Sequence, residues 1–153
     1  MHDIVLRPAT ADDAEFFFDL HEASLGPYVN QIWGWDDDEQ RAYLARHLVL
    51  EHVRVIVVDG VDAGRLDVEE RDDEVFLALI ELAPVHQGRG IGSRLIRELL
   101  DRASADGKRV TLSVLEANHR AYQLYRRLGF TEVSRDGVAP EVRIRMAAGS
   151  KAQ

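Results

Sequence analysis

Hydrophobic residues recur along this chain at two spacings, which predict a series of strands and helices. Alternating or continuous apolar runs indicate strands, and apolar residues three and four positions apart indicate helices. The expected strands cover residues 3–7, 53–58, 64–69, 75–82, 109–115, 130–135 and 142–146. The expected helices cover residues 10–23, 36–48, 91–107 and 118–128. This order of elements predicts an α/β fold with a mixed sheet.

Capping and turn residues mark where these elements begin and end. The signals are a capping box at Thr10 and Asp13, a chain break at Gly26 and Pro27, a helix cap at Asp36 and a hairpin turn at Asp59 and Gly60. The strand at residues 75–82 is almost wholly apolar. We therefore expect it to be central and buried on both faces.

Length and composition fit one globular domain. The chain has 153 residues, 46% hydrophobic and 30% charged, and can bury a sizeable core. We expect a single domain over residues 1–148 and a frayed tail over residues 149–153. Its apolar runs are far shorter than the roughly 20 residues of a membrane span, and no basic-then-apolar leader opens the chain. Together with the absence of cysteine, this predicts a cytoplasmic protein without a membrane partner or a thiolate metal site.

The charge is distributed unevenly along the chain. Residues 1–82 carry a formal net charge of −14 and residues 83–153 carry +6, within a total of −8. We expect an anionic ligand on the C-terminal half and a cationic ligand on the N-terminal half. Nucleic acid is not expected as a partner because it requires a broad basic face. Solvated surface charge is an equally good interpretation of the acidic half alone.

A glycine-rich turn joins the apolar strand at residues 75–82 to the next helix. Its residues are Gln87, Gly88, Arg89, Gly90, Ile91, Gly92 and Ser93. Glycines let the backbone approach a ligand, and the free N–H groups of a helix N-terminus favour phosphate oxygens. The spacing fits neither a Walker A loop nor the dinucleotide fingerprint. Taken alone, the turn is either an anion cradle or a tight connection between strand and helix.

A second segment, after the strand at residues 109–115, also has a distinctive pattern. Asn118 opens a helix whose apolar face includes Tyr125. Taken alone, Asn118 is an N-cap and Tyr125 is a core aromatic residue.

Together the two segments resemble the GCN5-related N-acetyltransferase (GNAT) family. The run Gln87-x-x-Gly90-x-Gly92 is similar to the family's acyl-coenzyme A motif. The run that begins at Asn118 and contains Tyr125 is similar to its second motif, and residues 4–13 are similar to its first strand and helix start. The resemblance covers most of the chain. It implies the acyl-CoA N-acyltransferase fold, a largely antiparallel twisted sheet of six to seven strands flanked by about four helices.

The resemblance also implies which residues bind acetyl-coenzyme A (acetyl-CoA). Backbone amides of residues 87–93 are expected to bind the pyrophosphate. The backbone near Glu81, with Leu82 and Ala83, is expected to bind the pantetheine arm, and Asn118 is expected to contact the same arm. Tyr125 is expected to protonate the departing thiolate or to donate a hydrogen bond to it. No metal is expected.

Direct acetyl transfer to an amine requires a neutral nitrogen, because an alkylammonium with a pKa of about 10.4 is mostly protonated at neutral pH. Glu81, which the resemblance places beside the thioester, is the first candidate for the general base. The alternatives are Asp36, Asp37, Asp38, Glu39, His21 and His47. A phenol with a pKa of about 10 is a poor proton donor to a thiolate whose acid has a pKa of about 8.5. A hydrogen bond is therefore the preferred role for Tyr125.

Aromatic side chains near the first two helices are candidates for the acceptor site. Tyr28, Trp33 and Trp35 are expected to form an aromatic wall, with core packing as the alternative for both tryptophans. Aromatic rings beside carboxylates suit a cationic amine. The expected acceptor is a primary amine of a small molecule or a peptide.

Two other functions stay open. A protein N-terminal acetyltransferase of the ribosomal-protein type would have a similar second motif, but Ser113 stands where some of those relatives have a glutamate. A non-catalytic coenzyme A-binding sensor or interaction module would not need the Tyr125 hydroxyl. Apolar strands near the C-terminus also leave a homodimer open.

Overall fold

A computed structural model describes residues 2–149 of the chain, which form two compact units. Unit 1 is formed within residues 2–67 and 79–89, and unit 2 within residues 68–78 and 90–149. Of the expected tail, residues 150–153 lie outside the described residues. The single domain over residues 1–148 stays a prediction.

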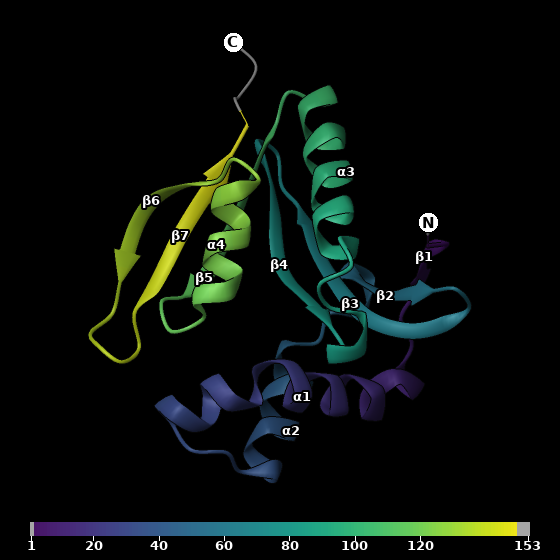
Figure 1. Cartoon of the computed structure of the whole chain (residues 1–153), viewed down its shortest axis with the longest axis vertical. Helices are drawn as coiled ribbons and strands as arrows, with labels where there is room; N and C mark the ends of the chain where they lie inside the picture. The colour runs from purple at the N-terminus through teal and green to yellow at the C-terminus, as the bar shows by residue number, and fades with distance from the viewer. Residues whose placement is uncertain (1, 150–153) are drawn as a thin grey trace. The chain divides into compact units, whose positions relative to one another are not determined.

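Unit 1 contains two helices and the N-terminal strands (Figure 1). Its elements are β1 (Ile4–Pro8), the 3-10 turn η1 (Ala11–Asp13), α1 (Ala14–Ile32), α2 (Asp37–His47), η2 (Leu50–His52), β2 (Val53–Val58), most of β3 (Val61–Glu70), the end of β4 (Glu74–Leu82) and η3 (Pro84–His86). β2 pairs antiparallel with both β1 and β3. Phe17 of α1 packs with Val53 and Val55 of β2 in the core of this unit.

Unit 2 contains the beginning of β4 and the C-terminal half of the chain. Its further elements are α3 (Ile91–Ala105), β5 (Arg109–Leu115), α4 (His119–Arg127), β6 (Thr131–Asp136) and β7 (Arg143–Ala148). The apolar face of α3 is buried, as its periodicity predicts: Ile91, Leu95, Ile96, Leu99 and Ala103. β7 also follows the predicted alternation, with Ile144 and Met146 buried and Arg143 and Arg145 exposed.

The strands form one seven-stranded sheet in the order β1-β2-β3-β4-β5-β7-β6. β4 and β5 are parallel, whereas β7 pairs antiparallel with both β5 and β6. A mixed, largely antiparallel sheet with four helices confirms the predicted fold class. The capping box at Thr10 and the hairpin turn at Asp59 and Gly60 are also confirmed, with both turn residues at positive φ.

The predicted end of the first helix near Ala23 is wrong. α1 continues through Gly26 and Pro27 to Ile32. A proline inside a helix costs about 3 kcal/mol, but Gly26 and Val29 are both buried. A Cβ atom at Gly26 would lie in ordinary contact with Trp35. Packing of this last part of α1 therefore outweighs the break signal.

The prediction that β4 is buried on both faces is also wrong for part of the strand. Val75 and Leu77 are buried, but Phe76 is only half-buried and Ala78 is exposed. The Arg71 guanidinium lies over the Phe76 ring, 4.4 Å from its centre. A charged side chain from the preceding turn thus covers a position where apolar packing was expected.

Within residues 2–149, no helix is both long enough and apolar enough to cross a bilayer.

Candidate functional site

The end of β4 has a backbone edge that β5 does not pair with. The pairing of β4 with β5 joins Glu74 through Leu77 to the start of β5, whereas β4 itself runs on to Leu82. Ala83 N donates to Ala63 O on β3 at 2.9 Å. Because backbone groups alternate in direction along a strand, the neighbouring Leu82 groups point to the other edge. The backbone oxygen of Leu82 accepts a hydrogen bond from Gln87 Nε2 at 2.9 Å.

Gly64 on β3 allows β4 to approach closely. A Cβ atom at this position would lie 2.3 Å from the backbone oxygen of Glu81 and 2.9 Å from Leu82 Cδ2. Real Cβ atoms do not come so near to backbone oxygen, so any side chain here would displace β4. Gly64 therefore sets the position of Glu81, a role that was not predicted from the sequence.

The glycine-rich turn has the backbone conformation of a strand-to-helix connection with an open surface. Gly88 and Gly90 have φ values of 73° and 78°, in the region that favours glycine. Gly90 is the N-cap of α3 and has no side-chain cap, and a Cβ atom there would meet nothing within 4 Å. The first N–H groups of α3 have no partner within the helix. The turn is therefore a tight strand-to-helix connection that requires glycine, and it also presents an exposed helix N-terminus suited to an anion.

Glu81 lies at the centre of a buried polar network in unit 1. Only 4% of this residue is exposed. Its Oε2 accepts a hydrogen bond from Ser24 Oγ at 2.6 Å and lies 3.3 Å from His21 Nδ1. His21 Nε2 lies 3.2 Å from Gln40 Oε1 on α2. Glu81 Oε1 is buried without a hydrogen-bond partner among the residues that the structure describes.

A second buried pair carries opposite charges on β3. Arg65 contacts both oxygens of Asp67, at 2.6 and 2.7 Å, and its guanidinium lies over the Phe17 ring. Burial raises the pKa of the Asp67 carboxyl above its ordinary value, although the Arg65 charge opposes this shift. The charge of Glu81 also raises the pKa of Asp67. Glu81 and Asp67 are therefore close enough to interact electrostatically.

The predicted acceptor residues have different environments. Trp35 packs against Phe18 and His21, with ring centres 6.0 and 5.9 Å apart, and its Nε1 donates to Asp37 Oδ1 at 2.7 Å. Trp33 is 48% exposed and Tyr28 is half-buried. The aromatic wall formed by these residues with Trp35 stays a prediction.

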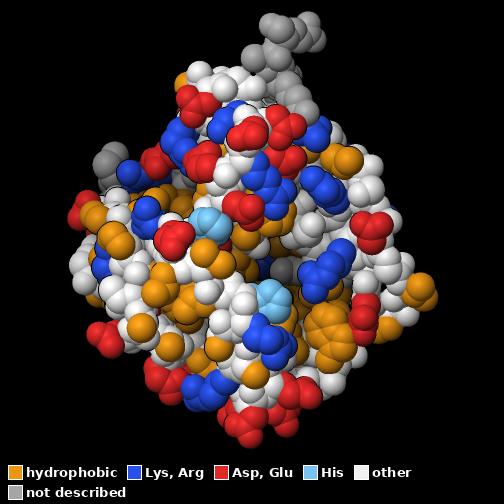
Figure 2. Space-filling view, turned by 180° about the vertical axis from the view of Figure 1, so that it is seen from behind, with side chains coloured by type: hydrophobic (Ala, Val, Ile, Leu, Met, Phe, Trp, Pro, Cys, Tyr) orange, Lys and Arg blue, Asp and Glu red, His pale blue; other side chains and the backbone are white. Residues whose placement is uncertain are grey.

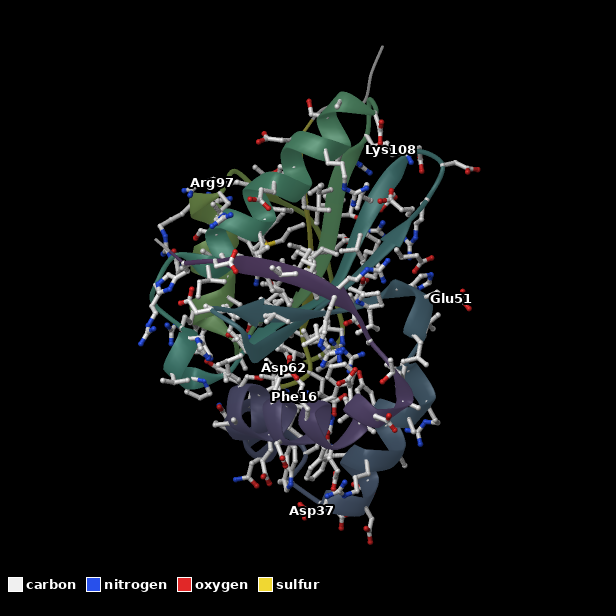
Figure 3. All side chains as sticks on the ribbon, turned by 90° about the vertical axis from the view of Figure 1, so that its right-hand side faces the viewer. Phe16, Asp37, Glu51, Asp62, Arg97 and Lys108 are labelled. Atoms are coloured by element: carbon white, nitrogen blue, oxygen red, sulfur yellow. The ribbon has the colours of Figure 1, made fainter. Side chains whose placement is uncertain are left out.

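An acidic surface surrounds the start of α2. It consists of Asp36, Asp37, Asp38 and Glu39, which are all exposed. Asp36 caps α2, as predicted, because its side chain accepts from Glu39 N. Asp37 lies at the bottom of Figure 3, and acidic side chains gather at the bottom of the view in Figure 2. This surface favours the approach of a cation.

In unit 2, Asn118 and Tyr125 have the local roles that their positions alone suggest. Asn118 caps α4, and its side chain accepts from Ala121 N at 3.2 Å. Tyr125 is 8% exposed, and its ring lies edge-on to Phe130. Burial raises the pKa of Tyr125 to about 12. Its hydroxyl therefore stays protonated throughout the neutral range.

No pattern in the sequence points to Ser24 or Gln40 as part of a site. Ser24 is separated from Glu81 by 57 positions and Gln40 from His21 by 19. No local pattern links such residues, because the contacts depend on how α1 and α2 pack. His21 was considered only as an alternative base, and it proves to be a neighbour of Glu81.

The chain is similar to known acetyltransferases. It is 52% identical over 54 residues to the N-alpha-acetyltransferase RimI of Mycobacterium tuberculosis, covering 35% of this chain and 33% of the relative. It is 34% identical over 103 residues to the L-methionine sulfoximine/L-methionine sulfone acetyltransferase of Salmonella typhimurium, covering 63% of this chain and 60% of the relative. The PaiA N-acetyltransferase from Thermoplasma acidophilum, solved in complex with coenzyme A, shares the fold. Its TM-score is 0.75 at 16% identity, over 95% of this chain and 98% of the other.

The alignments to curated relatives cover between 29% and 60% of those proteins' own lengths. This chain therefore matches only part of the length of each of these relatives. The family match extends further along this chain, because residues 9–130 match the Acetyltransferase (GNAT) family. Since this match spans well over half of the sequence, the chain belongs to the GNAT acetyltransferase family.

Proposed function

We propose that this protein transfers the acetyl group of acetyl-CoA to a primary amine, directly and without a covalent enzyme intermediate. The observation that carries the proposal is the end of β4, where an edge not paired with β5 leads into the glycine-rich turn and the uncapped N-terminus of α3. Acetyl-CoA supplies a thioester with a thiol leaving group. Residues 87–93 would hold its pyrophosphate, and the backbone at Leu82 and Ala83, with Asn118, its pantetheine arm.

Several backbone groups of this segment already have partners. Leu82 O accepts from Gln87, and Ala83 O accepts from His86 N at 2.8 Å. These bonds fix the shape of the turn, so the N–H groups near Leu82 and at the start of α3 are the ones that remain for a ligand. We expect the side chain of Gln87 to support the turn rather than to contact the ligand.

Glu81 is our candidate for the general base, because one oxygen of its buried carboxylate has no hydrogen-bond partner within residues 2–149. The proposed role of Tyr125 is a hydrogen bond to the departing sulfur. Full proton transfer from a group with a pKa of about 12 to a thiolate whose acid has a pKa of about 8.5 would be uphill by about 5 kcal/mol. The high pKa favours donation of a hydrogen bond instead.

We propose a cationic amine as the acceptor. The acidic surface at the start of α2 and the aromatic rings of Trp35 and Tyr43 support this class. The similarity to RimI supports a peptide N-terminus, and the similarity to the methionine sulfoximine acetyltransferase supports a small molecule. Cytoplasmic location and a homodimer stay predictions.

Thermal unfolding with and without acetyl-CoA tests the proposed ligand. At a hundred times the dissociation constant, binding should add about 2.7 kcal/mol, or roughly 5 to 10 °C for a domain of this size. Release of free thiol in the presence of amines then tests catalysis. No shift at millimolar acetyl-CoA would contradict the proposal.

Two glycines provide a matched pair for the turn. Gly90 and Gly60 have φ values of 78° and 83°, and a Cβ atom at either would meet nothing within 4 Å. Alanine at either position therefore imposes a similar backbone strain, about 1–2 kcal/mol. We expect only Gly90→Ala to weaken acetyl-CoA binding, as measured by titration calorimetry. Equal affinity in both variants would argue against a ligand at the turn.

A further inference from the structure

The Glu81 carboxylate is held unevenly by its neighbours in unit 1. Both contacts are to one oxygen: Ser24 Oγ donates to Oε2 at 2.6 Å, and His21 Nδ1 lies 3.3 Å from Oε2. The other oxygen, Oε1, is buried and has no hydrogen-bond partner among the residues of the described chain. Glu81 therefore has one engaged and one available oxygen.

His21 is itself fixed by α2. Its Nε2 lies 3.2 Å from Gln40 Oε1, and its ring is stacked on Tyr43, with ring centres 6.4 Å apart. On another side the ring packs against Trp35. Since His21 belongs to α1 and Gln40 to α2, both helices determine the orientation of the imidazole.

The other buried carboxylate near Glu81 has no available oxygen of this kind. Both oxygens of Asp67 contact Arg65, through Nε and one terminal nitrogen of the guanidinium. Arg65 thus donates both of these hydrogen bonds to Asp67. Of these two carboxylates, Glu81 is the one with an oxygen that no group of the described residues satisfies.

We infer that Ser24 and His21 are positioning residues for the general base. They hold Oε2 of Glu81 and leave Oε1 to receive the proton of the acceptor's ammonium group, directly or through one water molecule. In this step an N–H bond of the ammonium breaks and an O–H bond forms at Oε1. The nitrogen keeps the electron pair with which it attacks the thioester carbonyl. The C–N bond forms as the C–S bond breaks, and the second proton of the nitrogen passes to the departing thiolate, which leaves as the thiol of coenzyme A. The inference rests on the proposed function, because it concerns the same carboxylate.

The geometry matters because a base acts only on a proton within its reach. A carboxyl group that turned freely would present either oxygen, and a misplaced base loses much of its effect. The same contacts would also attach α1 to β4. A purely structural role would reduce activity with every acceptor equally, whereas a positioning role affects chiefly those acceptors that must lose a proton before their nitrogen can attack.

Two acceptors of the same skeleton separate these roles. One is an alkylamine, which is an ammonium ion at pH 7, and the other is the corresponding hydrazide, which is already neutral. For Ser24→Ala and His21→Phe we expect kcat with the alkylamine to fall by about 10-fold or more. We expect kcat with the hydrazide, and the acetyl-CoA dissociation constant, to stay within about twofold of wild type. The defect with the alkylamine should shrink as the pH rises, because the free amine then becomes more abundant.

Two further variants serve as controls. Ser24→Thr keeps the hydroxyl and should recover most of the activity that Ser24→Ala loses. Ser104→Ala makes the same chemical change at an exposed position of α3 and should leave both acceptors unaffected. A further measurement, by NMR, needs no substrate. Glu81→Gln should shift the imidazole 15N signals of His21, which report the hydrogen bonding of Nδ1.

The outcomes distinguish the inference from the proposed function. Equal losses with both acceptors, or full activity of Ser24→Ala with the alkylamine, would overturn the positioning role and leave the acetyltransferase proposal intact. Unchanged His21 signals in Glu81→Gln would contradict the contact itself. A wild-type protein that binds acetyl-CoA but acetylates no amine would overturn the proposed function, and the inference with it.

Discussion

Unit 1 buries more polar and charged side chains than unit 2 does. Among the described residues, the buried polar or charged side chains of unit 1 are Asp13, His21, Arg65, Asp67 and Glu81, and those of unit 2 are Glu74 and Thr111. The centre of unit 2 is apolar, with Ile96, Leu112 and Met146 almost completely inaccessible to solvent. Both units have an apolar core, which in unit 1 includes Phe17, Val53 and Val55. The difference is that unit 1 adds buried pairs of polar and charged groups to that core.

The contrast also separates two kinds of sensitivity to mutation. Removing one partner of a buried ion pair leaves an uncompensated charge, which costs more than removing a methyl group from an apolar core. Substitutions that test unit 1 should therefore act through charge and hydrogen bonding. Substitutions that test unit 2 should act through volume.

The largest effect is expected when the buried ion pair of unit 1 is broken. Arg65→Met should lower the free energy of unfolding by about 3–5 kcal/mol, because Asp67 loses its partner. Ile96→Val, in unit 2, should cost only about 0.5–1.5 kcal/mol. Urea unfolding measures both.

The double variant Arg65→Met/Asp67→Leu should recover much of this loss, since neither charge then remains buried. A double variant as unstable as Arg65→Met would mean that the packing of Arg65 on Phe17, rather than its charge, is the important contact.

A smaller effect is expected from two glycines of unit 1. Gly64→Ala should lower the free energy of unfolding by about 1–3 kcal/mol and displace Glu81. The reason is that the new Cβ atom would lie 2.3 Å from the backbone oxygen of Glu81. Gly26→Ala places its Cβ atom at ordinary contact distances inside α1, and it should stabilise the protein by up to about 1 kcal/mol. Thermal unfolding of the pair checks this, and similar destabilisation in both would contradict the close approach at Gly64.

In unit 2, substitution of Tyr125 tests the proposed hydrogen bond to the departing sulfur. Tyr125→Phe should lower kcat about 10-fold and leave acetyl-CoA affinity unchanged, because only the hydrogen bond to the sulfur is lost. Wild-type kcat in this variant would exclude the proposed role.

The pH dependence of stability gives a second readout for Tyr125. Since its pKa in the folded state is about 12 and a free tyrosine has about 10, the folded state retains the proton longer than the unfolded state. As the pH rises from 9 to 11, the free energy of unfolding of the wild type should therefore fall by about 1 kcal/mol more than that of Tyr125→Phe.

The smallest effect is expected at the capping box of unit 1. The Arg7 guanidinium and the Thr10 N–H lower the pKa of Asp13. Asp13→Asn should cost about 1 kcal/mol at pH 7, because the ion pair with Arg7 is lost. A lowered pKa means that this contribution is complete above the ordinary pKa of Asp and disappears as the pH falls through the pKa of folded Asp13. The difference in the free energy of unfolding between the two proteins, measured by urea unfolding, should therefore shrink as the pH is lowered below the ordinary pKa of Asp.

The elements of unit 2 could be predicted more accurately than those of unit 1. The apolar period of α3 and the alternation of β7 are local patterns, and the structure follows them. In unit 1, Gly26 and Pro27 signal a break that the buried face of α1 overrides. The candidate base Glu81 could be named from the family resemblance. Its partners Ser24 and His21 could not be assigned, nor could Gln40, which contacts His21, because only the packing of α1 and α2 brings these residues together.

The most direct test of the account is thiol release from acetyl-CoA in the presence of primary amines, by wild type and Glu81→Gln. The account predicts that the wild type releases one thiol for each amine acetylated, and that Glu81→Gln lowers kcat for an alkylamine by about 100-fold or more. Both proteins should bind acetyl-CoA equally well. If Glu81→Gln acetylates the alkylamine at the wild-type rate, the polar network of unit 1 is not the site of proton removal, and the central claim is wrong.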